Sequence, residues 1–201
     1  MKALNRHARL CAISVALMCP VAHSFSETIV VRRSLPPQTT VAQGYQCALQ
    51  AWKQNLGLWF VPPPFILDQG HPETGVGFVL MRVPPLGLRE GIVCRDEPAA
   101  DNLRMTYRVL NPSPFTWPVS EHVGEILFRP VKDDVCELEW TVRWTPLAAW
   151  LPFFPQALKA ITEFIIEWAA TYIVELCVSS NYHDGQESGR ISQLQTAGKR
   201  N

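Results

Sequence analysis

Two charged side chains on neighbouring predicted strands are the best candidates for chemistry in this chain. Glu90 shares the parity of Leu88, on the more apolar face of its strand, and Arg82 shares the parity of Leu80 on the strand before it. A carboxylate on a dry face can act as a general acid or base. A guanidinium there can bind a carboxylate, an enolate or a phosphate. The alternative is an ion pair at a sheet edge that serves only the structure.

Two histidines are further candidates for a general base. His122 begins a predicted strand and His71 lies in a loop, and either imidazole could accept a proton near neutral pH. Neither has a visible partner in the sequence, so we expect both on the solvated surface. No spacing of His, Cys and Asp suggests a metal site. No phosphate-binding glycine loop, nucleophile elbow or dinucleotide fingerprint is present, and we expect no cofactor.

The composition is that of one globular domain. The chain has 201 residues, 47% of them hydrophobic, and its 18 basic and 18 acidic side chains give no net charge. Such a hydrophobic fraction excludes a disordered protein. Zero net charge gives no general attraction to nucleic acid or anionic lipid, so we expect no nucleic-acid partner and at most transient membrane contact.

The first 24 residues resemble a signal segment. Lys2, Arg6 and Arg9 precede an uncharged run over 10–22 that is shorter than a membrane span. We therefore expect a targeting segment over 1–24 and a folded domain over 25–178, in a protein that is secreted or enters an endomembrane lumen. The alternative address is the plastid of an alga with complex plastids. A buried N-terminal helix is the alternative structure.

Alternating hydrophobicity predicts a strand-rich domain followed by a long helix. The clearest strand covers 135–144, where every second residue from Cys136 to Trp144 is apolar. Further strands are expected over 28–32, 75–83, 88–95, 103–110 and 122–129. One helix is expected from a Thr39/Thr40 cap to about residue 55 and another over 155–178, followed by a disordered polar tail over 179–201.

These elements predict an α+β fold in which an antiparallel sheet curls around the last helix. Each strand has one apolar face that needs a cover, and the last helix is the only element long enough to supply it. Three glutamates in that helix exclude a membrane span.

Large side chains with inward parity predict a pocket between the sheet and the last helix. Rings of this size on facing elements are difficult to pack without a void. Ordinary core packing is the alternative for each of them. The expected lining residues are Phe78, Tyr107, Ile126, Phe128, Trp140, Trp144, Ile165, Trp168 and Tyr172.

Two further features leave alternatives open. Cys47, Cys94, Cys136 and Cys177 follow the signal segment, and their spacing does not establish a disulfide. A proline-rich loop over 111–118 carries Phe115 and could be a lid, a membrane-touching tip or a packed loop.

The ordered series of strands resembles a known superfamily. It is similar to the polyketide cyclase/dehydrase-like branch of the START/Bet v 1-like (SRPBCC) superfamily over about residues 75–178. The matching segments are GVGFVLMR (75–82), LREGIV (88–93), DEP (96–98), MTYRV (105–109), VGEILF (123–128) and EWTVRW (139–144). The resemblance implies a helix-grip fold, a curved sheet holding the C-terminal helix, with an apolar cavity between them.

The resemblance also implies binding of a hydrophobic small molecule, such as a lipid, a polyketide or an isoprenoid-like compound. The alternative function is a cyclase- or dehydrase-like enzyme that uses Glu90 and Arg82 for acid/base and enolate chemistry. A purely structural or interaction role is the third possibility, because a fold does not determine a function.

Overall fold

The structure is a computed structural model that describes most of the chain beyond residue 26. The described residues are 27–54, 56, 62–82, 87–113, 117–131, 135–147 and 153–197, with side chains described as far as 180. The signal segment expected over 1–24 and the loop residue Phe115 lie outside the described residues.

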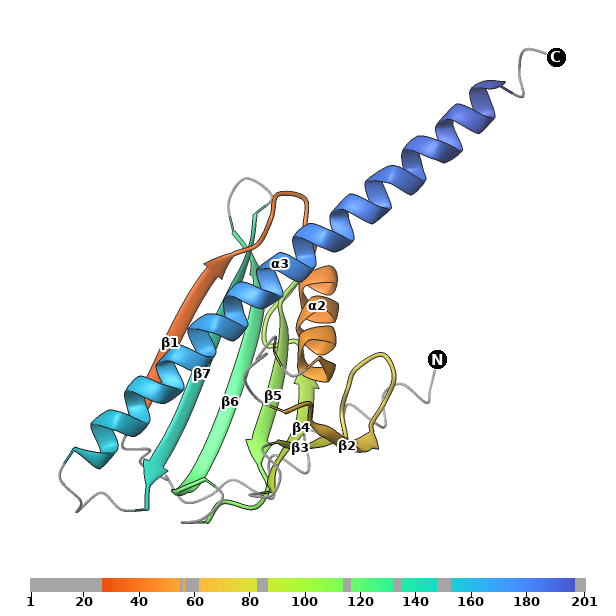
Figure 1. Cartoon of the computed structure of the whole chain (residues 1–201). Coiled ribbons are helices and arrows are strands. Elements are labelled where there is room, and N and C mark those ends of the chain that lie inside the picture. The colour runs from red at the N-terminus through yellow and green to blue at the C-terminus, as the bar shows by residue number, and fades with distance from the viewer. Residues whose placement is uncertain are drawn as a thin grey trace.

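Within the described residues, seven strands form one antiparallel sheet in the order β1-β7-β6-β5-β4-β3-β2. Figure 1 shows the sheet curving behind two helices that lie on the same face. These helices are α2 (Val41–Lys53) and α3 (Phe154–Ala197). The strands are β1 (Glu27–Ser34), β2 (Phe65–Gln69), β3 (Phe78–Arg82), β4 (Leu88–Asp96), β5 (Leu103–Val109), β6 (Val119–Pro130) and β7 (Cys136–Pro146).

The alternating sequence pattern places one face of each main strand in the core. In β7, burial alternates at every residue from Cys136 to Pro146, as the sequence predicts. The other predicted strands are confirmed as β1, β3, β4, β5 and β6. Strand β3 begins later than expected because Gly75 and Gly77, at φ angles of 70° and 84°, form a turn in front of it.

Strand β2 is an edge strand that the sequence analysis missed. It pairs with β3, with an irregularity between Ile66 and Asp68. All five of its side chains are exposed. Because neither face of this segment is buried, it carries no alternation of apolar and polar residues, and its sequence pattern does not indicate a strand.

Helix α2 begins at the predicted cap. The Thr40 side chain accepts a hydrogen bond from the backbone N–H of Gln43 at 3.2 Å, and Gln43 Oε1 accepts one from the Thr40 N–H at 2.8 Å. This capping box satisfies two backbone donors at the helix start. The helix then buries one side against the sheet, including the large rings of Tyr45 and Trp52.

Helix α3 is rotated relative to the expected orientation. Its buried positions are Leu158, Thr162, Ile166, Ala169, Ala170, Ile173 and Cys177. Ile161 and Trp168, which the sequence placed toward the sheet, are 54% and 37% exposed. Small alanines let the helix approach its neighbours closely, whereas an indole in their place would hold it away.

The C-terminal end of α3 also differs from expectation. Its backbone continues to Ala197, beyond the end near Val178 that the sequence predicted. Near its start, Lys159 Nζ lies 3.5 Å from Glu27 Oε2, so the helix runs along β1. No helix among the described residues is both long enough and apolar enough to cross a bilayer.

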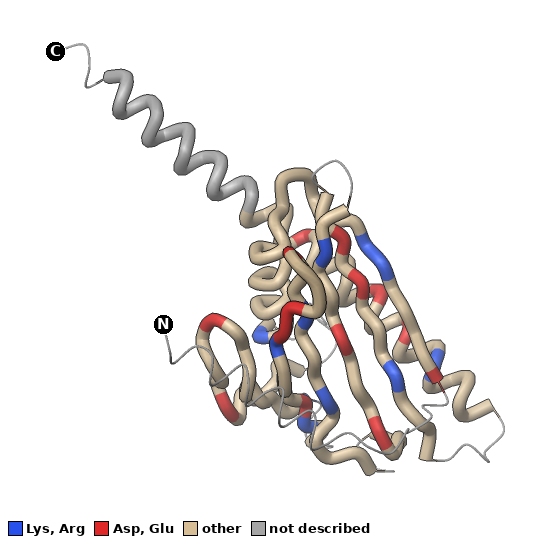
Figure 2. The backbone as a smooth tube through the Cα atoms, turned by 180° about the vertical axis from the view of Figure 1, so that it is seen from behind, with Lys and Arg blue, Asp and Glu red and all other residues tan. Residues whose placement is uncertain are grey.

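Charged side chains occupy the opposite face of the sheet. Seen from behind in Figure 2, acidic and basic residues alternate across the neighbouring strands. Arg129 Nη2 lies 2.6 Å from Glu137 Oε1, and Arg143 Nη2 lies 2.5 Å from Glu125 Oε1. Each such exposed pair contributes at most about 1 kcal/mol. Most of the stability therefore comes from the covered face, which is the side of the sheet that packs against α2 and α3.

A close contact on the covered face gives a test of this arrangement. A β-carbon at Gly124 would lie 2.0 Å from Cζ of Tyr107. The Tyr107 ring is held between Trp52 and Trp140. We expect Gly124→Ala to lower the free energy of unfolding by about 2–3 kcal/mol, measured by urea denaturation.

The matched control is Gly91→Ala on β4. Its β-carbon would lie 3.0 Å from Cδ1 of Leu110, a flexible side chain that is 47% exposed. The change should stay within about 0.5 kcal/mol. Equal stability of the two variants would contradict the packing of Tyr107 over Gly124.

Candidate functional site

The structure brings Glu90 and Arg82 together on the covered face of the sheet. Arg82 Nε donates a hydrogen bond to Glu90 Oε2, and Arg82 and Glu90 are only 5% and 9% exposed. Their strands are neighbours, with Leu80 paired to Glu90. The Arg82 guanidinium carbon lies 5.2 Å from the ring centroid of Trp52, near the end of α2. The ion pair is therefore buried under a helix.

Tyr107 lies beside this pair at the centre of the covered face. Its ring centroid is 4.4 Å from that of Trp52, and its hydroxyl accepts a hydrogen bond from Trp140 Nε1 at 3.1 Å. Burial, together with the negative charge of Glu90, raises the pKa of Tyr107 far above its usual value. The phenol therefore stays protonated.

His122 is the functional candidate that the sequence analysis placed wrongly. It is 7% exposed, and its Nδ1 accepts a hydrogen bond from Trp117 Nε1 at 2.9 Å. Burial lowers the pKa of His122 to about 4, an effect that the charge of Glu90 partly opposes. The ring is therefore neutral near neutral pH, and because Nδ1 is the acceptor, the proton is on Nε2. His122 thus offers an N–H donor and is a poor base.

A sequence signal for this placement was present. His122 shares the parity of Gly124, Ile126 and Phe128, and the structure buries all four positions. His71 does lie on the exposed side of a loop, where its Nδ1 is 3.3 Å from the backbone N of Glu73. The two histidines therefore differ in environment, since only His122 lies on the covered face.

Three buried N–H donors on this face have no hydrogen-bond acceptor among the described residues. They are Nε2 of His122, Nε1 of Trp52 and Nε1 of Trp144. His122 and Trp144 are paired positions on β6 and β7. Buried donors of this kind are nearly always satisfied in folded proteins, by water if by nothing else. These three N–H groups are therefore the donors on this face that an acceptor outside the described residues would satisfy.

We call the residues Arg82, Glu90, Tyr107, His122 and Trp52 the inner polar cluster. Around it, most of the expected pocket residues are brought together by the sheet. Those that are buried on the covered face are Phe78, Tyr107, Ile126, Phe128, Trp140 and Trp144. Ile165 is partly buried against the same core.

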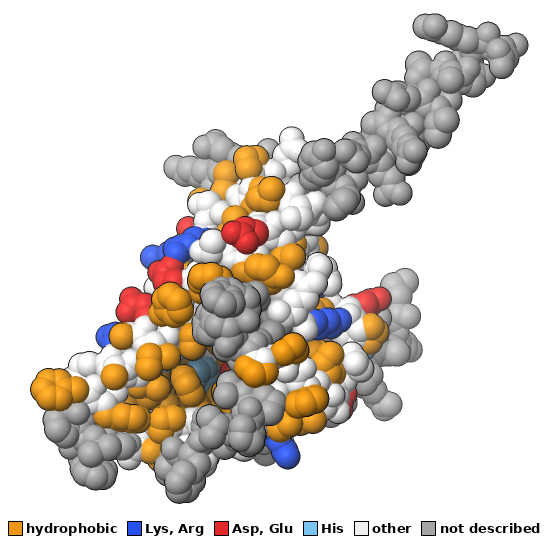
Figure 3. Space-filling model, viewed as in Figure 1, with side chains coloured by type: hydrophobic (Ala, Val, Ile, Leu, Met, Phe, Trp, Pro, Cys, Tyr) orange, Lys and Arg blue, Asp and Glu red, His pale blue; other side chains and the backbone are white. Residues whose placement is uncertain are grey.

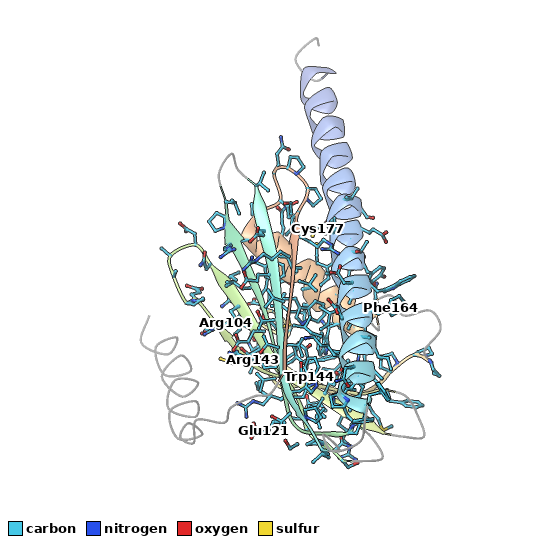
Figure 4. All side chains as sticks on the ribbon, turned by 90° about the vertical axis from the view of Figure 1, so that its left-hand side faces the viewer. Arg104, Glu121, Arg143, Trp144, Phe164 and Cys177 are labelled. Carbon is cyan, nitrogen blue, oxygen red and sulfur yellow. The ribbon has the colours of Figure 1, made fainter. Side chains whose placement is uncertain are left out.

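Trp168 lies elsewhere, which corrects its predicted place in the pocket, whereas Tyr172 is also partly buried against the core. They line a hollow of about 470 Å³ on the flank of α3, together with Phe164, Glu167, Thr171 and Glu175. Figure 4 shows Trp144 between the sheet and α3 but Phe164 on the outer side of the helix. Hydrophobic side chains gather along this part of α3 in Figure 3. Tyr172 also donates a hydrogen bond to Gln54 Oε1 at 2.8 Å.

Among the described residues, no group of three or more His, Cys, Asp and Glu side chains could hold a metal ion. The side chains on the covered face comprise a carboxylate, a guanidinium, a phenol, a neutral imidazole and three indoles in an apolar environment. In such surroundings each polar contact is stronger than in water.

Comparison with known proteins supports the fold alone. No family model matches the chain, and no curated protein matches its sequence. Norcoclaurine synthase from Thalictrum flavum, in complex with dopamine and hydroxybenzaldehyde, superposes with a TM-score of 0.54 at 15% identity, covering 76% of this chain and 87% of that one. A protein from Nitrosospira multiformis gives 0.55 at 13% identity, covering 78% and 99%.

A protein from Thermus thermophilus gives a TM-score of 0.54 at 11% identity and covers 77% of this chain and 99% of that chain. The chain thus has the α+β helix-grip fold, a curved antiparallel sheet around a long C-terminal helix. The fold that the resemblance to the START/Bet v 1-like superfamily implied is therefore confirmed.

The buried imidazole predicts a pH dependence of stability. The pKa of His122 falls from 6.5 to about 4 on folding, so the unfolded chain binds more protons between these values and stability decreases as the pH falls through them. From about pH 7 to pH 5, His122 alone should remove about 2 kcal/mol from the free energy of unfolding.

Urea denaturation at both pH values measures this effect. His122→Gln keeps a polar side chain but cannot titrate, so its stability should fall less over this range by about that amount. His71→Gln is the control and should retain the full decrease. A His122→Gln variant with an unchanged pH dependence would refute the neutral, buried state of His122.

Proposed function

We propose that this protein binds a hydrophobic small molecule carrying a hydrogen-bond acceptor, on the covered face of the sheet beneath α2 and α3. The single observation that carries the proposal is the buried Nε2–H of His122, which has no acceptor among the described residues. Lipid, polyketide and isoprenoid-like compounds with a carbonyl or hydroxyl group fit this description.

The lack of net charge around this site restricts the class of ligand that it can bind. Arg82 and Glu90 neutralise each other, and Tyr107 and His122 are uncharged near neutral pH. A ligand beside them gains little from carrying a charge and would lose its hydration on burial. We therefore infer a neutral acceptor such as a ketone. The aromatic compounds bound in the norcoclaurine synthase structure, dopamine and hydroxybenzaldehyde, support small aromatic ligands by analogy of fold.

Two matched probes test the proposal directly. The compounds 2-acetylnaphthalene and 2-isopropenylnaphthalene have nearly the same shape, but only the first carries a carbonyl acceptor. We expect the ketone to bind about 5–10-fold more tightly, the worth of one buried hydrogen bond, in fluorescence titrations. His122→Phe removes the donor and should abolish the preference, whereas the loop variant His71→Phe should retain it.

Circular dichroism and the thermal midpoint of each variant verify that it is folded. Equal affinity of the wild-type protein for the two probes, or a preference that survives in His122→Phe, would overturn the role of His122. A wild-type protein that binds neither probe would contradict a cavity that accepts ligands of this size.

The position of Glu90 supports a second candidate function. This is the abstraction of a proton from the carbon next to a carbonyl group, as in the cyclisation or dehydration of a polyketide. Its charge acts on both Tyr107 and His122, so a carboxylate and an N–H donor belong to one cluster. In this reaction Glu90 takes a proton from the carbon beside the carbonyl, while Arg82 and His122 Nε2–H stabilise the enolate oxygen. Binding then becomes the first step of a reaction.

Deuterium exchange separates the two candidates. An enzyme of this kind should exchange the methyl protons of 2-acetylnaphthalene in D₂O faster than buffer, as followed by NMR. Glu90→Gln should lose at least about 100-fold of this rate while ketone binding remains, and the exposed Glu97→Gln should match the wild type. The double variant Arg82→Gln/Glu90→Gln removes both buried charges together, so that no lone charge destabilises the fold. Wild-type exchange no faster than in Glu90→Gln and in the double variant would leave binding as the function.

A further inference from the structure

Two buried thiols meet where α2 and α3 cross. Cys47 on α2 is 5% exposed and Cys177 on α3 is fully buried, and each thiol shifts the pKa of the other. Cys47 Sγ also lies 3.8 Å from Ser180 Oγ, one turn further along α3. Figure 4 shows Cys177 on the part of α3 that lies beside α2.

The backbones of the two helices approach each other closely. Their Cα atoms approach within 8 Å at several positions. Fully buried alanines occupy neighbouring positions on the same helix sides, Ala51 one turn after Cys47 and Ala170 two turns before Cys177. A disulfide needs Cα atoms about 4.4–6.8 Å apart, and small side chains permit that approach.

The two thiols differ in the way that thiol–disulfide exchange requires. Hydrogen bonds from Cys177 and Ser180 lower the pKa of Cys47 to about 7, although burial acts in the opposite direction. The shared proton and burial raise the pKa of Cys177 far above its usual value. Burial, together with the negative charge of Glu137, raises the pKa of Cys136 to about 11. Cys47 is therefore the nucleophilic thiol and Cys177 the one that resolves.

We propose that Cys47 and Cys177 form a disulfide that joins α2 to α3 when the chain folds in the presence of a small disulfide such as oxidised glutathione. The Cys47 thiolate attacks one glutathione sulfur, forming a mixed disulfide and releasing one glutathione thiolate. The Cys177 thiolate, its proton passed to solvent, then attacks the Cys47 sulfur and releases the second. Two protein thiols are oxidised, and one glutathione disulfide is reduced to two thiols.

The bond would hold together the two helices that cover the sheet. It closes a loop of about 130 residues, and long loops gain the most from such a link. The signal segment proposed over 1–24 would deliver the chain to a compartment where disulfides persist. The proposal is independent of ligand binding, because it concerns only the contact between the helices.

The test refolds the full chain in oxidised and reduced glutathione and maps the cysteines by mass spectrometry after alkylation. We expect one Cys47–Cys177 linked peptide, with a mass about 2 Da below that of the two thiol peptides. The thermal midpoint should rise by about 5–10 °C and return to its starting value with dithiothreitol.

Matched variants assign the effect. Cys47→Ser and Cys177→Ser should each abolish both the linked peptide and the thermal shift, whereas Cys94→Ser and Cys136→Ser should retain them. Complete alkylation of Cys47 and Cys177 in the refolded wild-type protein would overturn the proposal. So would a linked peptide that pairs either of them with another cysteine.

Discussion

A sheet with a single apolar face has to be covered, and most of this structure follows from how that is done. The strands bury alternate residues on one side and carry ion pairs on the other. Two helices cover the buried side, α3 along β1 and α2 over the central strands. Burial on this face supplies the main driving force for folding, whereas the exposed ion pairs contribute little.

The same cover creates a problem for polar side chains on the buried face. A charge taken out of water is costly unless it is paired, and Arg82 and Glu90 meet that condition by pairing with each other. Tyr107 is satisfied by Trp140. The N–H groups at His122 Nε2, Trp52 Nε1 and Trp144 Nε1 have no such partner among the described residues, and the proposed ligand would satisfy that of His122.

Alternation predicted the main strands and which of their residues face inward, because a half-buried strand has only two sides. The rotation of α3 could not be predicted in the same way, since apolar residues lie on nearly every side of it and only packing selects Ile166 over Trp168. Strand β2 has no buried side and left no pattern. The place of His122 in the alternating pattern of β6 indicates a side chain that faces the core. Histidine is a polar residue, however, and the sequence analysis therefore expected it on the solvated surface.

The pairing of β1 with β7 has a consequence for how the chain folds. Arg32 and Glu139, which are hydrogen-bonded across these strands, are 107 residues apart in the sequence. During synthesis, β1 leaves the ribosome before β7 and has no partner strand on this side until β7 has emerged. Such a high contact order slows folding. Until β7 is available, the apolar surfaces of β1 and α2 remain exposed and prone to aggregation. We therefore expect nascent chains of this protein to depend on chaperones more than a helical bundle of the same length would.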